Sequence, residues 1–142
     1  MSFREKVAWV LLAAVLMGLA VYLYVVLGIA SVSGWDAPVW AIVPGLIAMG
    51  LLTAILAAIG AAVTATRSRE DAHAPADERD RSIARLAAAR SYSMIVPGLA
   101  GIVTAMLLGA TLFQVANLLV ALFLASEAIR YASEAIAYRR GL

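Results

Sequence analysis

The chain contains no cysteine and very little charge. Charged residues make up 14% of its 142 residues and hydrophobic residues 64%, with a mean hydropathy of +0.93. The absence of cysteine excludes disulfides, thiolate metal sites and cysteine nucleophiles. A soluble globule usually has about a quarter of its residues charged, so this chain has too little polar surface to cover itself in water. The composition therefore predicts an integral membrane protein.

The residue patterns of common catalytic and cofactor-binding sites are also missing. The chain has no HExxH pair, no GxSxG elbow and no phosphate-binding glycine loop. Its single histidine, His73, is expected to be an exposed loop residue, because a metal site needs several convergent ligands. Ser126 stands beside Glu127 without a base that would complete a catalytic triad. We therefore expect no enzymatic activity and no bound metal or cofactor.

Four apolar stretches are long enough to cross a bilayer as helices. At about 1.5 Å of rise per residue, about 20 residues cross a hydrocarbon core of about 30 Å. The first stretch is longer than the apolar region of a secretory signal, so we expect it to be retained. The predicted fold is all-α, an integral membrane four-helix bundle forming a single domain over residues 1–142. Its predicted spans are residues 7–30, 37–66, 94–113 and 117–138.

Basic residues are concentrated in one polar segment, residues 67–92. Six of the 11 basic residues and five of the nine acidic ones lie between Arg67 and Arg90. The predicted turns at 31–38 and 113–117 contain no arginine or lysine. Because cytoplasmic loops carry an excess of these residues, both termini and the polar segment are predicted to be cytoplasmic, in a bacterial inner membrane. The arginines alternate with acids and lack an aromatic platform, so we expect no nucleic-acid partner.

Within the polar segment, the sequence DERDRSIARLAAARS at 77–91 predicts a short amphipathic helix before the third span. Asp77 is placed to cap this helix, and acidic residues in its first turn suit the helix dipole. Pro97 is expected to kink the chain between this surface helix and the span. A solvated linker is the alternative reading. The candidate contacts to anionic lipid or to a partner are Arg79, Arg81, Arg85 and Arg90.

Small residues recur at intervals of four in the predicted spans, which places them on one helical face. Such faces allow two helix backbones to approach closely. The alternative is that alanine is simply abundant in this chain. We expect these faces to pack helices together, within the chain or against itself or another membrane protein. The residues concerned are Ala14 and Gly18; Gly50, Ala54, Ala58 and Ala62; and Gly101, Ala105 and Gly109.

The fourth span carries a stripe of polar residues. Two spans and a turn need more residues than lie between Met94 and Ile129, so the fourth helix must continue past Ile129. Glu127 is then expected near the bilayer midplane. Offsets of 3, 4, 7 and 11 return to one face of a helix with about 3.6 residues per turn. The candidate intramembrane polar cluster is Glu127, Arg130, Tyr131, Glu134 and Tyr138.

Arg130 has the spacing to pair with an acid on either side, Glu127 and Glu134. Ionisable groups deep in a bilayer normally pair, or face the bundle interior or a wet cavity. The alternative is that the helix ends early, with these residues in the headgroup zone and Arg139 and Arg140 as interfacial anchors.

The charged motif at 77–81 and the closing motif at 138–141 also support a resemblance. The residues concerned are Asp77, Glu78, Arg79, Asp80 and Arg81, with Tyr138, Arg139, Arg140 and Gly141. With two apolar spans on either side of the polar segment, the chain resembles a loose group of small, uncharacterised four-span prokaryotic membrane proteins. That resemblance implies an inner-membrane location and no established activity. The chain is also similar in size to small multidrug exporters, but their first-span glutamate is missing, because residues 7–30 contain no acid.

Three classes of function fit these observations. The first is a non-enzymatic membrane scaffold or accessory protein, which packs through small-residue faces and contacts lipid and partner proteins. The alternative is a small proton-linked carrier or channel using Glu127 and Glu134, since buried acids in membrane helices often mark ion paths. A membrane enzyme acting on lipid is the third class, and no motif supports it.

Overall fold

The computed structural model describes residues 3–67 and 77–140, and in these two ranges it is all-α. The helices are α1 (Phe3–Ser33), η1 (Val39–Ile42, a 3-10 turn), α2 (Val43–Arg67), α4 (Glu78–Leu107) and α5 (Leu112–Arg140). Four of them, counting η1 with α2, are long and apolar enough to cross a membrane. The prediction of an all-α chain with four apolar helices is confirmed.

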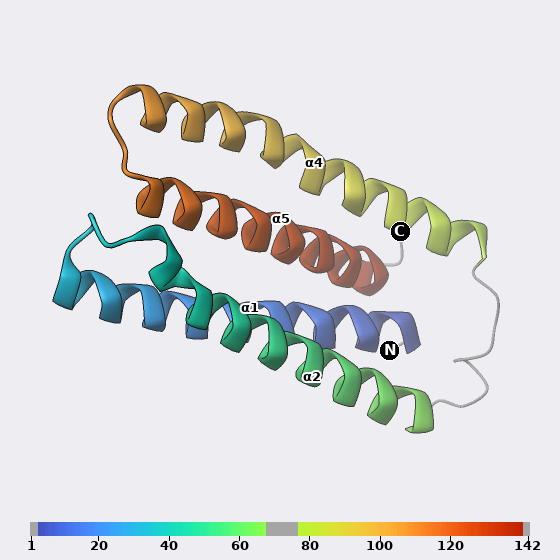
Figure 1. The fold of residues 1–142 in the computed structure, drawn as a ribbon. Coiled ribbons are helices and arrows are strands. Elements are labelled where there is room, and N and C mark those ends of the chain that lie inside the picture. The colour runs from blue at the N-terminus through green and yellow to red at the C-terminus, as the bar shows by residue number, and fades with distance from the viewer. Residues whose placement is uncertain (1–2, 68–76, 141–142) are drawn as a thin grey trace.

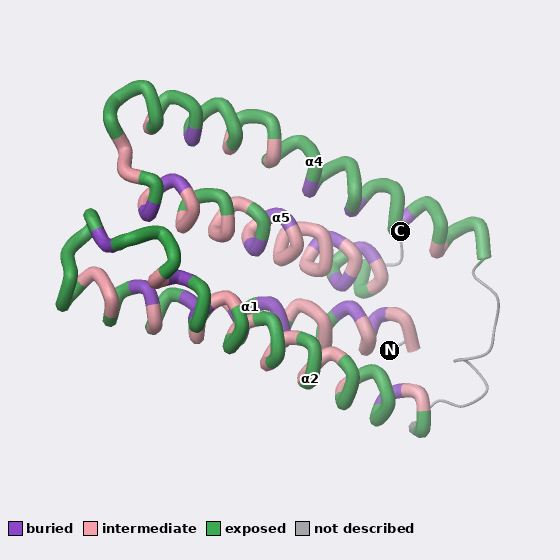
Figure 2. Tube along the Cα trace, viewed as in Figure 1, coloured by how far each residue is buried: buried purple, intermediate pink, exposed green. Residues whose placement is uncertain are grey.

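The long helices lie in a row in the order α2, α1, α5, α4 (Figure 1). α1 and α2 form one hairpin and α4 and α5 form another, and the hairpins meet where α1 packs against α5. Residues of α2 and α4 are mostly exposed, whereas burial is concentrated in the central pair (Figure 2). The bundle is thus two joined hairpins rather than a closed ring, and each outer helix packs extensively on one neighbour.

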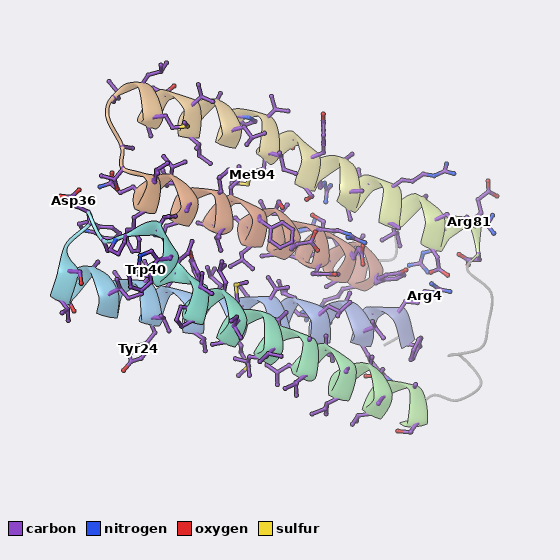
Figure 3. The ribbon with its side chains drawn as sticks, in the orientation of Figure 1. Arg4, Tyr24, Asp36, Trp40, Arg81 and Met94 are labelled. Carbon is purple, nitrogen blue, oxygen red and sulfur yellow. The ribbon has the colours of Figure 1, made fainter. Side chains whose placement is uncertain are left out.

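The row has two distinct ends. The turn end holds the short connections of both hairpins, where Gly34 (φ 73°) and Gly109 (φ 91°) adopt the left-handed conformation that favours glycine. The opposite end, called the charged end here, is where α1 and α4 begin and α2 and α5 finish. Arg4 and Arg81 lie at the charged end and Asp36 at the turn end (Figure 3).

A buried cluster joins the two hairpins at the turn end. Phe113 at the start of α5 is only 1% exposed, and its ring lies 6.5 Å from that of Trp35, centroid to centroid. The hydroxyl of Tyr22 donates a hydrogen bond to Oδ1 of Asn117 at 2.7 Å. Thr111 Oγ1 donates to the carbonyl of Trp35 at 3.0 Å. The buried members of the cluster are Tyr22, Val26, Ala37, Ile42 and Phe113.

The prediction of a short amphipathic helix separate from the third span is wrong, because both belong to the single helix α4. Pro97 lies inside α4. A proline removes one backbone donor, but α4 continues on either side of it from Glu78 to Leu107. The inner face of the predicted surface helix packs on α5, with Ile83, Ala87 and Ser91 buried.

The last turn also differs from the predicted one. α4 ends at Leu107 and α5 begins at Leu112, so the connection lies before the predicted 113–117. The reason is a capping box, in which Thr111 Oγ1 accepts from the Gln114 amide at 3.3 Å and Gln114 Oε1 accepts from the Thr111 amide at 3.0 Å. The pattern Thr-x-x-Gln before an apolar run is a helix-start signal. It fixes the start of α5 at the turn end.

Most of the small-residue faces do not pack within the chain. Ala14 and Gly18 on α1 are buried as expected, and a Cβ on Gly18 would meet the Thr53 side chain of α2. The small-residue ladder predicted on α2 does not pack within the chain, because α2 turns its Thr53 face to α1, and its packing against a second copy or another protein stays a prediction. The ladder residues Gly50, Ala54, Ala58 and Ala62 are exposed, as is Gly101, and Gly109 lies in the turn.

Candidate functional site

The two ion pairs expected along α5 are both present. Arg130 Nη1 lies 3.7 Å from Glu127 Oε2, and Arg130 Nε lies 3.6 Å from Glu134 Oε1. The spacing of three and four residues places all three side chains on adjacent turns of one helical face. We refer to Glu127, Arg130 and Glu134 as the ion triad.

The ion triad is loosely held and partly open. Both nitrogen to oxygen distances exceed the about 2.8 Å of a tight charge-assisted hydrogen bond. The Arg130 side chain is 43% exposed, while those of Glu127 and Glu134 are 25% and 17% exposed. Arg130 also lies over the ring of Tyr131, 5.4 Å from its centroid. Two carboxylates share one guanidinium, so the fully ionised triad carries one surplus negative charge.

The triad occupies the middle and second half of α5. Because α5 runs from Leu112 to Arg140, Glu127 lies about 20 Å from either end at 1.5 Å of rise per residue. The helix therefore does not end early, while the depth of these residues in a membrane stays a prediction. Glu134 lies closer to the charged end, about 9 Å before Arg140.

A groove of about 330 Å³ opens beside Glu127. Its walls come from α1, α2 and α5, with α1 between the other two in the row. Most of its lining is apolar, and Tyr131 and Thr53 add two hydroxyl groups. Glu127 is the one charged residue that lines this groove in the described part of the chain. We refer to this cavity as the triad groove.

Tyr138, the last member of the predicted stripe, belongs to a separate group at the charged end. Its hydroxyl donates to Asp80 Oδ1 at 3.0 Å, and Arg4 Nε lies 2.9 Å from Asp80 Oδ2. These residues come from α5, α4 and α1, so Asp80 connects three helices. We refer to Arg4, Asp80 and Tyr138 as the latch. A cavity of about 270 Å³ beside it is lined by Glu134 and Arg81 as well.

Sequence reasoning missed the latch. The sequence places Asp80 in the charged first turn of a helix, where it forms a capping box with Asp77. Its amide donates to Asp77 Oδ1 at 2.7 Å, and its Oδ2 accepts from the Asp77 amide at 3.2 Å. The spacing Asp-x-x-Asp was the available local signal. Nothing in the sequence pointed to Arg4 or Tyr138 as its partners.

The four candidate arginines of the charged segment are exposed along the first half of α4: Arg79, Arg81, Arg85 and Arg90. Arg81 lines the cavity beside the latch, and the other three do not line it. The four therefore do not converge on one binding site, and their contact with lipid or a partner stays a prediction. His73 lies outside the described residues, and within 3–67 and 77–140 no group of three or more His, Asp or Glu residues could hold a metal ion.

Comparison of the chain with protein-family models, with curated proteins and with solved structures found no match in any of the three. The resemblance to small four-span prokaryotic membrane proteins therefore stays a prediction, and the function is argued below from the geometry alone.

Proposed function

We propose that this protein is a multi-pass protein of a bacterial inner membrane, with α1, α2, α4 and α5 as its spans and both termini in the cytoplasm. The outward faces of the row support this placement, because large apolar side chains on α2 such as Leu51, Ile55 and Ile59 are more than half exposed. Soluble monomers rarely expose contiguous apolar surface of this extent. The charged end, with its arginines, would face the cytoplasm.

We further propose that it acts as a non-enzymatic scaffold or accessory subunit, which assembles with a second copy or with another membrane protein. The observation that carries this proposal is the partly exposed guanidinium of Arg130, well inside a membrane-length helix. A charged side chain at the centre of a span costs at least about 2.5 kcal/mol, so such residues normally face protein or water. A partner surface over Arg130 would remove this cost.

The outer helices give such a partner room to bind. The face of α2 with Gly50, Ala54 and Ala58 is exposed, and no other atom lies within 4 Å of a Cβ placed on Gly50. Faces of this kind favour close helix association in membranes. At the charged end, the exposed arginines of α4 would contact anionic lipid or a cytoplasmic part of the partner.

Single-cysteine crosslinking tests the scaffold proposal, because the chain has no native cysteine to interfere. We expect Ala58→Cys on the exposed face of α2 to give an adduct of defined higher mass in native membranes. Ala8→Cys is the control, since Ala8 is only 1% exposed inside the hairpin pair. Absence of adducts at Ala58 and at Val103 of α4, together with a monomer mass after gentle extraction, would contradict the proposal.

A proton-linked carrier is the second candidate, because Glu127 lines a groove at the middle of a proposed span. Membrane-embedded carboxylates that face cavities often relay protons. Vesicles that contain the protein and a pH-sensitive dye would measure proton flux for the parent and for Glu127→Gln. Glu78→Gln, at the exposed start of α4, is the matched control. Equal flux in parent and Glu127→Gln would exclude this role for Glu127.

A further inference from the structure

We propose that the triad groove binds a small lipophilic organic cation, an ammonium or phosphonium centre joined to an apolar body. The cationic centre would lie against the carboxylate of Glu127, and the apolar body against the walls from α1, α2 and α5. This inference goes beyond assembly with a partner, because the site is complete within one copy of the chain.

The size and lining of the groove suit such a molecule. Its volume of about 330 Å³ falls at the lower end of the roughly 300–1,000 Å³ of small-molecule sites. The walls include Val15, Met49 and Phe123, which offer apolar and polarisable contact surface. Ligand sites usually combine such walls with a few well-placed polar groups. Here those groups are the Glu127 carboxylate and the Tyr131 phenol.

The charge balance of the ion triad favours a cation over a neutral or anionic ligand. Arg130 is shared between two acids at 3.6 and 3.7 Å, so neither pair is tight. Glu134 lines the cavity beside the latch, where two cations, Arg4 and Arg81, and one further acid, Asp80, also lie. Glu127 lines the groove without another charged residue from the described chain. A cation in the groove would lie beside Glu127 and compensate the surplus negative charge of the triad. Glu127 is the acid of the triad with fewer protein cations nearby.

The ring of Tyr131 supplies a further favourable contact. Aromatic faces attract ammonium-type cations, and the contribution rises when the site is shielded from water. Arg130 already lies over this ring. A ligand cation beside Glu127 would therefore take the place of Arg130 on this ring and on Glu127, while Arg130 keeps its pair with Glu134.

An inorganic cation fits this groove poorly. Hard cations require several oxygen ligands. No group of three or more His, Asp or Glu residues in the ranges 3–67 and 77–140 could hold a metal ion. An organic cation needs only one carboxylate, because its remaining surface is apolar and matches the walls.

Gly50 and Ala54 of α2 line the groove and are exposed, and their small side chains leave space there. In a bilayer, this part of α2 would face lipid wherever the proposed partner does not cover it. A lipophilic cation partitions into the bilayer and would reach Glu127 laterally, without passing through either end of the row.

Binding of radiolabelled tetraphenylphosphonium to the full-length protein in phosphatidylcholine nanodiscs tests this proposal. Tetraphenylborate is the matched probe, since it has nearly the same size and shape but the opposite charge. We expect saturable binding of the phosphonium to protein-containing discs above the level of empty discs, and no such binding of the borate. Equal saturable binding of both ions, or none of the phosphonium, would overturn the proposal.

Two pairs of variants locate the site. Glu127→Gln should weaken phosphonium binding by about tenfold or more, because a desolvated charge pair is lost, while Glu78→Gln should leave it unchanged. Gly50→Leu should abolish binding by filling the groove, while Gly101→Leu on α4 should not. Neither glycine has another atom within 4 Å of the position of a Cβ, so we expect both leucine variants to fold. Unchanged binding in Glu127→Gln or in Gly50→Leu would overturn the assignment to this groove.

Discussion

The two ends of the helix row are fastened by different chemistry. At the turn end, Tyr22, Asn117 and Phe113 join the hairpins through a neutral hydrogen bond and buried apolar surface. At the charged end, Arg4 and Tyr138 meet the single carboxylate of Asp80. Neutral buried contacts are insensitive to salt, whereas partly exposed ion pairs are screened by it. The contacts of the turn end should therefore be independent of salt, whereas the strength of the charged end should depend on it.

The largest effect is expected from Phe113→Ala at the turn end. The ring is 1% exposed, and its loss should lower the free energy of unfolding by about 3 kcal/mol, the lower end of the range for buried aromatic residues. Thermal unfolding in detergent, followed by circular dichroism, measures the change. Phe123→Ala on the same helix is the control, because Phe123 is 60% exposed and should cost far less. Equal losses would mean that the turn-end cluster is not a core.

A smaller effect is expected from Tyr22→Phe. The variant removes the donor to Asn117 Oδ1 and leaves that acceptor unpaired in a mostly apolar cluster. We expect a loss of about 1–2 kcal/mol in the free energy of unfolding, and the same loss at low and high salt. Tyr24→Phe is the matched control, because Tyr24 is 81% exposed on the same helix. A loss that shrinks with added salt would contradict the assignment of neutral chemistry to this end.

Tyr138→Phe is expected to cost less than Tyr22→Phe. Asp80 keeps Arg4 and the amide of Asp77 as partners after the Tyr138 hydroxyl is removed. We expect a loss of about 0.5–1 kcal/mol, within the usual range for one hydrogen bond. The same unfolding measurement checks this value against that of Tyr22→Phe. A larger loss at position 138 would reverse the proposed ranking of the two ends.

The smallest effect, and the one that depends on salt, is expected from Arg4→Gln. The Arg4 side chain is 39% exposed, so its pair with Asp80 should contribute about 0.2–1 kcal/mol at low ionic strength. At about 1 M salt, where the screening length is about 3 Å, parent and variant should unfold at nearly the same temperature. A difference that persists at high salt would show that the charged end is not held by a screened pair.

Local features of the fold could be predicted from the sequence. Run length and composition are enough to identify four apolar helices, because each must satisfy its own backbone hydrogen bonds. The pairing of Arg130 with Glu127 and Glu134 follows from helical spacing alone, without knowledge of any neighbouring helix. The start of α5 was also readable, since Thr111 and Gln114 form a standard capping pattern that the prediction overlooked.

Features that depend on which helices become neighbours could not be predicted. Tyr138 and Asp80 are separated by 58 positions, and no periodicity links them. The choice of α2 face is a similar case, because Gly18 fits against Thr53 rather than against the ladder that includes Gly50. Pro97 predicts a kink between a surface helix and a span, and the buried residues Ile83 and Ile102 on either side of it belong to one helix.

Asp80 couples the first turn of α4 to the contacts between the two hairpins. The same carboxylate that closes the first turn of α4 through Asp77 also receives groups from α1 and α5. Fraying of that turn would therefore loosen its contacts with α1 and α5 at the charged end, and loss of those contacts would in turn loosen the turn. Backbone amide exchange near residue 80 should thus report on whether the two hairpins are in contact at the charged end.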